Sequence, residues 1–412
     1  MTGTASTIID LSSGPLIEVV ERGIDRLFHE GASDITLQSD DYIWAYINRR
    51  HTRVSSRRLD DSELGQLTTR FYPGGESGMA ILGGGTPLDP ETSIRPRLDP
   101  QKEDYDPDYE LRCRANITKC RVGTSANGIS ITLRTIPGTP PALASLGLPE
   151  EIVQTMFPSQ GLVLVAGITG SGKSTLLAAA NAHRLAGDEP VKILTYEDPV
   201  EFIYPRLPAS AMGPGGPSAR MPEVSQVQLH SHLESFSLVA PNLLRRKADV
   251  IVMGEMRDRE SMETGLLASA TGHCTYATLH CETPAEVIAR VVSEFPYERQ
   301  PAVANQLLDN LRLVIAQKIE RDVSGKGRAF RSWCVFDQAL KHALSELPFQ
   351  QWARRIRQRI LGRKQDFAHQ ALSALRAGEI SPEAFARVAG FNPIEAREFL
   401  QHAESEEAAC GS

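Results

Sequence analysis

The stretch GITGSGKST, residues 167–175, fits the pattern G-x-x-x-x-G-K-[ST] of a phosphate-binding loop. The run before it, GLVLVAG at 161–167, is short and apolar and contains β-branched valines, so we expect a buried parallel strand there. The run after it, residues 174–187, repeats apolar residues on one face and is expected to form a helix. A strand, a glycine turn and a helix are the context in which this motif binds phosphate.

The residue types of this loop are those that phosphate binding requires. Glycines let backbone N–H groups curl around phosphate oxygens, and the start of the helix adds a partial positive charge. Lys173 is placed to reach the β- and γ-phosphates, and the Ser174 hydroxyl to hold Mg²⁺. We predict that the chain binds a nucleoside triphosphate, rather than having a glycine-rich turn without a ligand. The predicted nucleotide-binding residues are Gly167, Thr169, Gly170, Ser171, Gly172, Lys173, Ser174 and Thr175.

Length and composition describe an ordinary globular chain of two or three domains, with 412 residues, 41% of them hydrophobic and 23% charged. The net charge of −7 gives no overall field that favours nucleic acid or an anionic membrane. No apolar run approaches the roughly 18 residues of a transmembrane helix, and the start of the chain lacks a signal-peptide pattern. The cysteines, at positions 113, 120, 274, 281, 334 and 410, form no C-x-x-C pair. Neither a zinc site nor a disulfide scaffold is expected, and the reducing cytosol fits best.

We expect an N-terminal domain over residues 1–136 and a stiff, proline-rich linker over 137–144. Alternating strands and helices over 145–345 predict a parallel, doubly wound α/β domain, and 346–412 is expected to be helical. Before the linker we expect a helix at 15–30, strands at 34–38, 42–47, 111–118 and 129–134, a helix at 61–72, and a long solvated loop at 73–110. After it we expect strands at 161–167, 191–196, 249–254 and 275–279.

Three segments of the later chain carry further expectations. The proline- and glycine-rich stretch 205–223 is expected to be a mobile loop or an insertion, and Pro241 should kink or interrupt a helix near 230–247. Thr283 to Glu286 has the spacing of a capping box that opens a helix. The basic helix 352–364 should bury one apolar face. It favours a solvated or partner-facing role over a membrane-surface role.

Arginines lie on the polar faces of the two strands before the linker. Period-two alternation puts Arg112 and Arg114 together, and places Arg134 on the polar face of its own strand. One interpretation is a solvated sheet face. The other is an arginine cluster that reaches the γ-phosphate bound by a neighbouring subunit.

Carboxylates follow two of the predicted strands of the α/β domain. DVIVMGEMRD at 249–258 is an apolar strand followed by Glu255, and the carboxyl end of a parallel strand is where such sheets bind ligands. We predict that Glu255 is the general base or orients water, against the alternative of a structural ion pair. Glu197, Asp198 and Glu201 follow another strand, where Glu197 can hold Mg²⁺ through water. A plain turn at Pro199 is the other interpretation of that segment.

Two histidines flank the fourth strand. His280 follows it and is placed to contact the γ-phosphate, while His273 precedes it. A lone histidine is more often structural than functional, and no Cys/His ligand set at zinc spacing accompanies this pair.

Four stretches together resemble the type II/IV secretion ATPase family: GITGSGKST, the acidic box TYEDPVEF, the strand VIVMGEMRD and the histidine box TGHCTYATLH. GASDITLQ at 31–38 and ITLRTIP at 131–137 extend the resemblance into the N-terminal domain. The runs SITLRTIPGTPP and LRRKADVIVMGEMRD are most similar to the DotB/TraJ branch, which serves type IVB secretion and conjugative plasmid transfer. The resemblance spans roughly residues 15–345.

This resemblance implies a ring-forming, usually hexameric ATPase with a PAS-like N-terminal domain and a RecA-like domain. ATP and Mg²⁺ would be its cofactors, its place cytoplasmic and peripheral at the inner membrane, and its partners the secretion or transfer apparatus, without specific nucleic-acid binding. It implies that Lys173 and Ser174 bind phosphate and Mg²⁺ and that Glu255 is catalytic. The resemblance further implies acidic-box residues Glu197 and Glu201, histidine-box residues His273 and His280, and arginine fingers among Arg112, Arg114 and Arg134.

Other functions remain open at this point. A pilus retraction or assembly motor would share the chemistry and differ only in its partner. A RecA-like nucleic-acid translocase needs a basic, aromatic-lined groove, which the acidic balance does not favour. A GTPase would need an N-K-x-D stretch, which the sequence lacks. A nucleotide-binding scaffold without turnover would not need Glu255.

Overall fold

The computed structural model describes residues 8–47, 50–95, 110–122, 125–136, 138–187, 189–204, 223–229 and 232–410. The chain divides into two compact units, Met1–Gly138 and Thr139–Ser412. The expected loop at 205–223 lies outside the described residues except for Glu223, which begins a strand. The finer domain boundaries predicted after residues 136, 144 and 345 remain predictions.

The first unit is built on an antiparallel sheet, in the strand order β3-β2-β1-β6-β5-β4 for the part of the chain that is described. Its elements are α1 (Leu16–His29), β1 (Ala32–Gln38), β2 (Trp44–Ile47), β3 (Arg50–Arg53), α2 (Asp61–Phe71), α3 (Ser77–Gly83), β4 (Glu91–Ile94), β5 (Leu111–Val122) and β6 (Ser125–Thr135). Alternate residues of β5 and β6, such as Ala115 and Leu133, pack under α1 and α2 in one apolar core.

The expectation of one long loop at 73–110 was wrong in part. α3 and the edge strand β4 lie inside this segment, and residues 96–109 are outside the described part. The helix α3 was not predicted because its segment is rich in glycine, which has a low helix propensity and usually indicates a turn. β4 pairs with β5 antiparallel, with Glu91 opposite Arg114.

The second unit contains a mainly parallel sheet in the order β13-β12-β7-β11-β10-β8-β9 across its described residues. β12 and β13 pair antiparallel at one edge, and the other pairs are parallel. The strands are β7 (Gly161–Ala166), β8 (Lys192–Glu197), β9 (Glu223–Gln228), β10 (Val250–Met253), β11 (Cys274–Leu279), β12 (Leu311–Arg321) and β13 (Gly327–Val335). The sequence predicted β7, β8, β10 and β11, whereas β9, β12 and β13 were not predicted.

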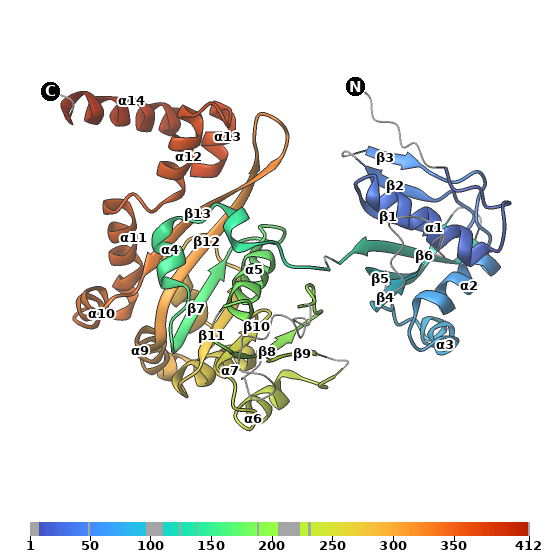
Figure 1. Cartoon of the computed structure of the whole chain (residues 1–412), viewed down its shortest axis with the longest axis horizontal. Coiled ribbons are helices and arrows are strands. Elements are labelled where there is room, and N and C mark those ends of the chain that lie inside the picture. Colours follow the sequence, from blue (N-terminus) through green and yellow to red (C-terminus); the bar gives the residue numbers. More distant parts are fainter. Residues whose placement is uncertain are drawn as a thin grey trace, which may run out of the picture. The chain divides into compact units, whose positions relative to one another are not determined.

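Helices cover both faces of this sheet (Figure 1). Val163 and Val165 of β7 pack with α5 on one face, while Leu162 and Leu164 pack with α7 and α9 on the other. A strand buried on both faces reads as a continuous apolar run, which explains the GLVLVAG pattern. The helices are α4 (Glu150–Thr155), α5 (Lys173–Leu185), α6 (Val239–Leu243), α7 (Arg259–Ala270), α8 (Val287–Val292), α9 (Gln300–Asn310), α10 (Gln338–Ser345), α11 (Trp352–Gly362), α12 (Phe367–Arg376), α13 (Pro382–Ala389) and α14 (Pro393–Cys410), with short 3-10 turns η1 (Leu143–Leu146), η4 (Phe236–Leu238), η5 (Tyr297–Arg299) and η6 (Phe349–Gln351).

Two expectations about helices differ from the structure. The helix expected near 230–247 is present in the described residues only as η4 and the five-residue α6. Pro241 is the third residue of α6 and lies within its first turn, so the helix does not break at this proline. The capping box expected at Thr283 is wrong. α8 begins at Val287, and the Glu286 carboxylate accepts from the backbone N–H of Glu282 at 3.3 Å.

The C-terminal helices share the core of the sheet. Trp352, Ile356 and Ile360 of α11 are buried, as their spacing predicted, and they join the same apolar cluster as Val303 of α9 and Phe385 of α13. None of the helices in the described ranges is both long enough and apolar enough to cross a membrane.

Lys341 of α10 gives this region a pH-dependent stability. Its Nζ donates to the backbone oxygen of Asp309 at 2.6 Å, and burial, with Arg312 nearby, lowers its pKa to about 8. An unfolded lysine titrates near 10.4, so between about pH 8 and about pH 10 the unfolded chain holds more protons and stability rises with pH. Below pH 8 both states are charged, and the cost of burying the ammonium is present in full.

We therefore expect Lys341→Met to remove this rise. The difference in thermal midpoint between variant and wild type should favour the variant most at pH 7 and shrink toward pH 10. The exposed Lys326→Met serves as the control for loss of a lysine. A difference that stays constant from pH 7 to pH 10 would contradict the assignment.

Candidate nucleotide site

The phosphate-binding loop leaves the carboxyl end of β7 and enters α5. Gly167, Gly170 and Gly172 have φ angles of 151°, 77° and 80°, which side chains with a Cβ rarely adopt. A Cβ on Gly167 would lie 2.5 Å from the backbone oxygen of Gln317, so only glycine fits there. Thr169, in the middle of the turn between β7 and α5, is exposed. The backbone is therefore free to present its N–H groups, as an anion site at a helix N-terminus requires.

The side chains of the loop are arranged across its mouth. Lys173 is 9% exposed, and its Nζ donates to the backbone oxygens of Gly167 and Ile168 at 2.8 and 3.0 Å. An ammonium has three donors, so one remains for a phosphate oxygen. Burial lowers the Lys173 pKa, and the charges of Glu255 and Glu201 act in the opposite direction. Ser174 and Thr175 are half-buried in the first turn of α5.

Glu255 lies two residues beyond β10, at the same edge of the sheet as the loop. Its Oε1 is 2.8 Å from Nε2 of His280, the residue that follows β11. Its Oε2 is 3.5 Å from Nε of Arg257, which donates through Nη2 to Asp198 at 3.1 Å. One cluster thus joins the carboxyl ends of β8, β10 and β11, and the side chains of Glu255 and His280 are 25% and 47% exposed.

Glu197 ends β8 and lies beside the Glu255 segment. A Cβ on Gly254 would come within 3.1 Å of the Cα of Glu197, so β8 and β10 approach closely where their acidic residues begin. The Thr278 hydroxyl donates to the backbone oxygen of Gly254 at 2.5 Å and fixes that turn. Four predicted residues, Glu197, Asp198, Glu255 and His280, therefore lie at the loop's edge of the sheet.

His273 does not join them. It precedes β11, where its Nδ1 contacts Thr271 Oγ1 at 3.0 Å and the backbone oxygen of Ala268 at 3.2 Å. A six-residue strand separates it from His280, which is about 20 Å at the usual rise. The contacts of His273 are those of a structural residue at the opposite edge of the sheet.

The three arginines lie in the first unit, and each pairs with a carboxylate there. Arg112 is only 6% exposed, and its Nε donates to Glu91 at 2.5 Å, so the expected solvated face is wrong at this position. Nε and Nη2 of Arg114 donate to the two carboxylate oxygens of Asp89. Nε and Nη2 of Arg134 donate to one carboxylate oxygen of Asp34 at 2.8 and 2.6 Å, and the side chain is 70% exposed.

Three residues of this region were not predicted. Arg257 follows Glu255 by two positions, and its sequence signal was its place directly beyond the strand. Gln317 and Arg331 lie on β12 and β13, behind the loop, and no sequence signal marked them because those two strands were not predicted.

The residues present fit a nucleotide with Mg²⁺. The described residues contain no group of three or more His, Cys, Asp or Glu side chains that is placed to hold a metal. Mg²⁺ in such sites is held by one or two protein groups together with phosphate oxygens and water, so Ser174 and Glu197 supply groups of the required kind. The hydroxyl of Ser171 is buried and has no hydrogen-bond partner in the described structure, which leaves a polar atom inside the loop.

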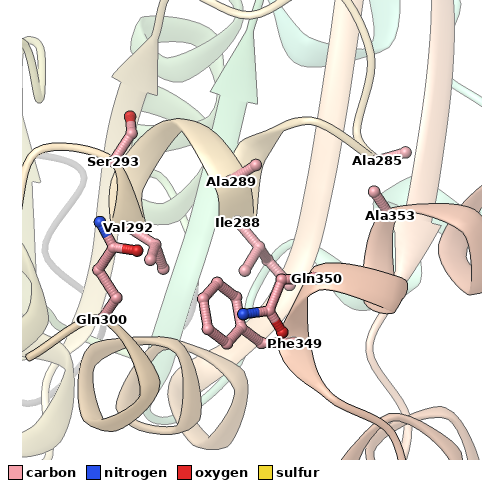
Figure 2. A pocket seen from close by; sticks show the side chains of 9 residues that line it. All are labelled: Ala285, Ile288, Ala289, Val292, Ser293, Gln300, Phe349, Gln350 and Ala353. Carbon is pink, nitrogen blue, oxygen red and sulfur yellow. The ribbon is translucent and has the colours of Figure 1, made fainter. Parts of the chain in front are cut away.

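A separate pocket of about 200 Å³ lies away from these strand ends. It is formed between α8, the start of α9, η6 and α11. Figure 2 shows Ile288, Val292 and Phe349 lining it, with the amide of Gln350 beside them. Its lining is mainly apolar and contains no charged side chain, so it does not suit a phosphate.

The chain is similar in sequence to two bacterial proteins and in structure to a solved ATPase. Escherichia coli YggR, described as uncharacterized, is 38% identical over 196 residues, which cover 48% of this chain and 56% of YggR. A twitching motility protein of Neisseria gonorrhoeae is 32% identical over 290 residues, 70% of this chain and 73% of that protein. The X-ray structure of the Legionella pneumophila ATPase DotB matches with a TM-score of 0.77 and 32% identity, covering 93% of this chain and 99% of that one.

The sequence profile of the family described as type II/IV secretion system protein matches residues 106–364. This span begins in the first unit and includes the loop, both acidic segments and the histidine segment. The resemblance noted from the sequence motifs is thereby confirmed. Because the match covers more than half of the chain and the whole nucleotide site, this chain belongs to the type II/IV secretion system protein family, a family of ATPases.

Proposed function

We propose that this chain is a Mg²⁺-dependent, ATP-hydrolysing motor that acts as a ring, usually a hexamer, and powers type IVB secretion or conjugative plasmid transfer. The observation that carries the proposal is the likeness to the ATPase DotB, which extends over 93% of this chain and so includes both units. In this proposal the first unit is a PAS-like domain and the second a RecA-like domain. The ring is cytoplasmic and peripheral at the inner membrane, held there by proteins of the secretion or transfer apparatus, without specific binding of nucleic acid.

The residues of the site divide the work of hydrolysis. Lys173 and the loop backbone bind the phosphates, and Mg²⁺, when bound by Ser174 and through water by Glu197, neutralises phosphate charge. Glu255 orients and deprotonates the attacking water, since its carboxylate lies at the strand edge that faces the loop. His280 donates to Glu255 and holds it in place, and Arg257 ties it to Asp198. Glu201 adds negative charge near Lys173.

Arginines complete the site from a neighbouring subunit in this proposal. Arg134 is the best placed of the three to leave its partner, because its side chain is 70% exposed whereas Arg112 is buried. Arg134→Ala should lower hydrolysis by about a hundredfold or more while nucleotide affinity changes little, since an arginine finger stabilises charge that develops in the transition state. The readouts are steady-state hydrolysis and equilibrium nucleotide binding.

Mixed rings separate action across a boundary from action within a subunit. Arg134→Ala subunits keep an intact loop, and Lys173→Ala subunits keep an intact arginine, so mixing them should restore part of the activity. Arg95→Ala, which removes an exposed arginine paired with Glu110 in the same unit, is the control and should behave as wild type. Mixed rings that stay inactive would count against action across the boundary.

Assembly itself has a direct test. Specific ATPase activity of the wild type should rise steeply with protein concentration if neighbouring subunits complete each site, and a mass measurement at each concentration should show rings forming in parallel. Flat activity with monomers throughout would overturn the ring proposal. Activity that requires single-stranded DNA would instead favour a translocase.

A pilus retraction or assembly motor is the second candidate, favoured by the identity with the twitching motility protein over 70% of the chain. The two candidates share their chemistry and differ in the partner. Deletion of the gene should abolish plasmid transfer or protein secretion and leave twitching intact if the first proposal holds. Loss of twitching alone would favour the pilus motor.

A further inference from the structure

Gln317 touches the phosphate-binding loop from behind. It lies on β12, which runs parallel to β7 with Ala316 opposite Ala166, so Gln317 reaches the level of the loop's first glycine. The residue is 3% exposed. Its backbone oxygen borders Gly167, and its side-chain Nε2 donates to the backbone oxygen of Ser171 at 2.6 Å. A Cβ on Gly172 would come within 2.9 Å of that same Nε2.

Arg331 fixes which way this amide points. It stands directly opposite Gln317 in the β12–β13 pairing, is also 3% exposed, and donates through Nε to Gln317 Oε1 at 2.8 Å. A guanidinium can only donate hydrogen bonds, so the amide of Gln317 must turn its oxygen, and not its nitrogen, toward Arg331. The amide nitrogen must then face Ser171, whose carbonyl can only accept. A turned amide would break both bonds.

Burying the charged guanidinium of Arg331 costs desolvation free energy, which argues that its contact with Gln317 has a role. Within the described residues it forms no ion pair with a carboxylate, and its further contact is Nη1 with the backbone oxygen of Gly147 at 3.4 Å. Burial lowers its pKa to about 10, so it remains charged at neutral pH. Its backbone N–H donates to Gln370 of α12 at 3.0 Å, which holds β13 at the same residue. Two apolar side chains would fill this space without a buried charge.

We propose that Gln317 is a positioning residue that holds residues 167–172 in the shape that binds phosphate, and that Arg331 aims its amide. The pair acts on the loop through the backbone of Ser171 and the close approach of Gln317 to Gly172. The inference rests on the proposed nucleotide site at this same loop. It adds a contact that sets the loop geometry from the side that packs against β12.

The test uses the full chain and separates positioning from stability. Gln317→Leu alone leaves Arg331 buried without its acceptor, so the thermal midpoint should fall by several degrees. The double variant Gln317→Leu/Arg331→Met replaces both polar groups by apolar ones and should regain most of that loss. Amide hydrogen exchange of peptides covering 167–172, without nucleotide, should nevertheless stay about tenfold or more faster than in wild type, because the bond to Ser171 is gone.

Affinity for a fluorescent ATP analogue should fall by about tenfold in the double variant, equivalent to about 1.4 kcal/mol. Tyr204→Phe is the control, since it removes another buried contact, with Asn181 of α5 at 3.2 Å, that does not touch the loop. Its loop exchange should match wild type. A double variant with wild-type loop exchange and affinity would overturn the proposal, because the pair would then be merely structural.

A second variant covers the case in which the double variant does not fold. Gln317→Glu keeps an acceptor for Arg331 and cannot donate to Ser171, so faster loop exchange with a retained midpoint supports positioning, and wild-type exchange overturns it. Loop exchange in nucleotide-free protein does not depend on hydrolysis. Failure of this proposal is therefore distinguishable from failure of the proposed function, which Lys173 tests.

Discussion

Lys173→Ala should abolish nucleotide binding at concentrations that saturate the wild type, and should lower hydrolysis by at least about a hundredfold. The ammonium lies across the mouth of the loop, where it bridges two backbone oxygens and has one donor left for phosphate. Alanine removes both the charge that attracts phosphate and the bridge that closes the loop. Equilibrium binding of ATP and steady-state hydrolysis measure the two losses.

Lys192→Ala is the matched control for this change. Lys192 lies on β8 of the same sheet and pairs with Glu223 at 3.0 Å, away from the loop. Its variant should bind and hydrolyse ATP as the wild type does. Circular dichroism and a thermal midpoint should show that Lys173→Ala is folded. Near-normal turnover in folded Lys173→Ala would refute the assignment of this loop as the phosphate site.

Glu255→Gln should retain ATP binding within a few fold and lower turnover by about a hundredfold to ten-thousandfold, the usual range for loss of a general base. Glutamine keeps the shape of the side chain and can still contact His280, which lies 2.8 Å from Oε1. It lacks the negative charge that takes a proton from water. The variant therefore separates binding from chemistry, and ATP should accumulate on it without hydrolysis.

Glu263→Gln controls for the loss of one carboxylate. Glu263 lies on α7, is 42% exposed, and pairs with Arg259 and Arg299 on the surface. It should leave turnover unchanged. Hydrolysis that survives in Glu255→Gln would move the catalytic role to another carboxylate at the same edge, and Glu201 would be tested next because its charge reaches Lys173.

The parts of the fold that the sequence predicted are those with strong local signals. β7, β8, β10 and β11 are apolar runs buried in a parallel sheet, and the phosphate loop is a motif with fixed geometry. β9 and β13 mix polar with apolar residues, and β12 carries Gln317 and Lys318 in its second half, so their patterns do not separate a strand from a helix. Their pairing depends on contacts distant in the sequence, which local pattern does not encode.

The site residues divide in the same way, into those that a local pattern predicted and those that depend on distant contacts. Strand direction alone brought Glu255, Glu197 and His280 to the loop's edge of the sheet, because parallel strands all end there. The same rule shows that His273, which precedes the strand that His280 follows, cannot lie with His280. Burial of Arg112 was not predictable, since it depends on Glu91 of β4, a strand that lay inside an expected loop.

The common core of the sheet and the C-terminal helices has a practical consequence for protein production. A chain shortened at residue 345 would lose α11 to α14 and bare apolar side chains of the β12–β13 pair, such as Phe330 and Cys334, which share a core with these helices. Exposed patches of this kind promote aggregation. A shortened protein should be recovered mainly from inclusion bodies, and affinity tags are better placed after α14 than between these helices.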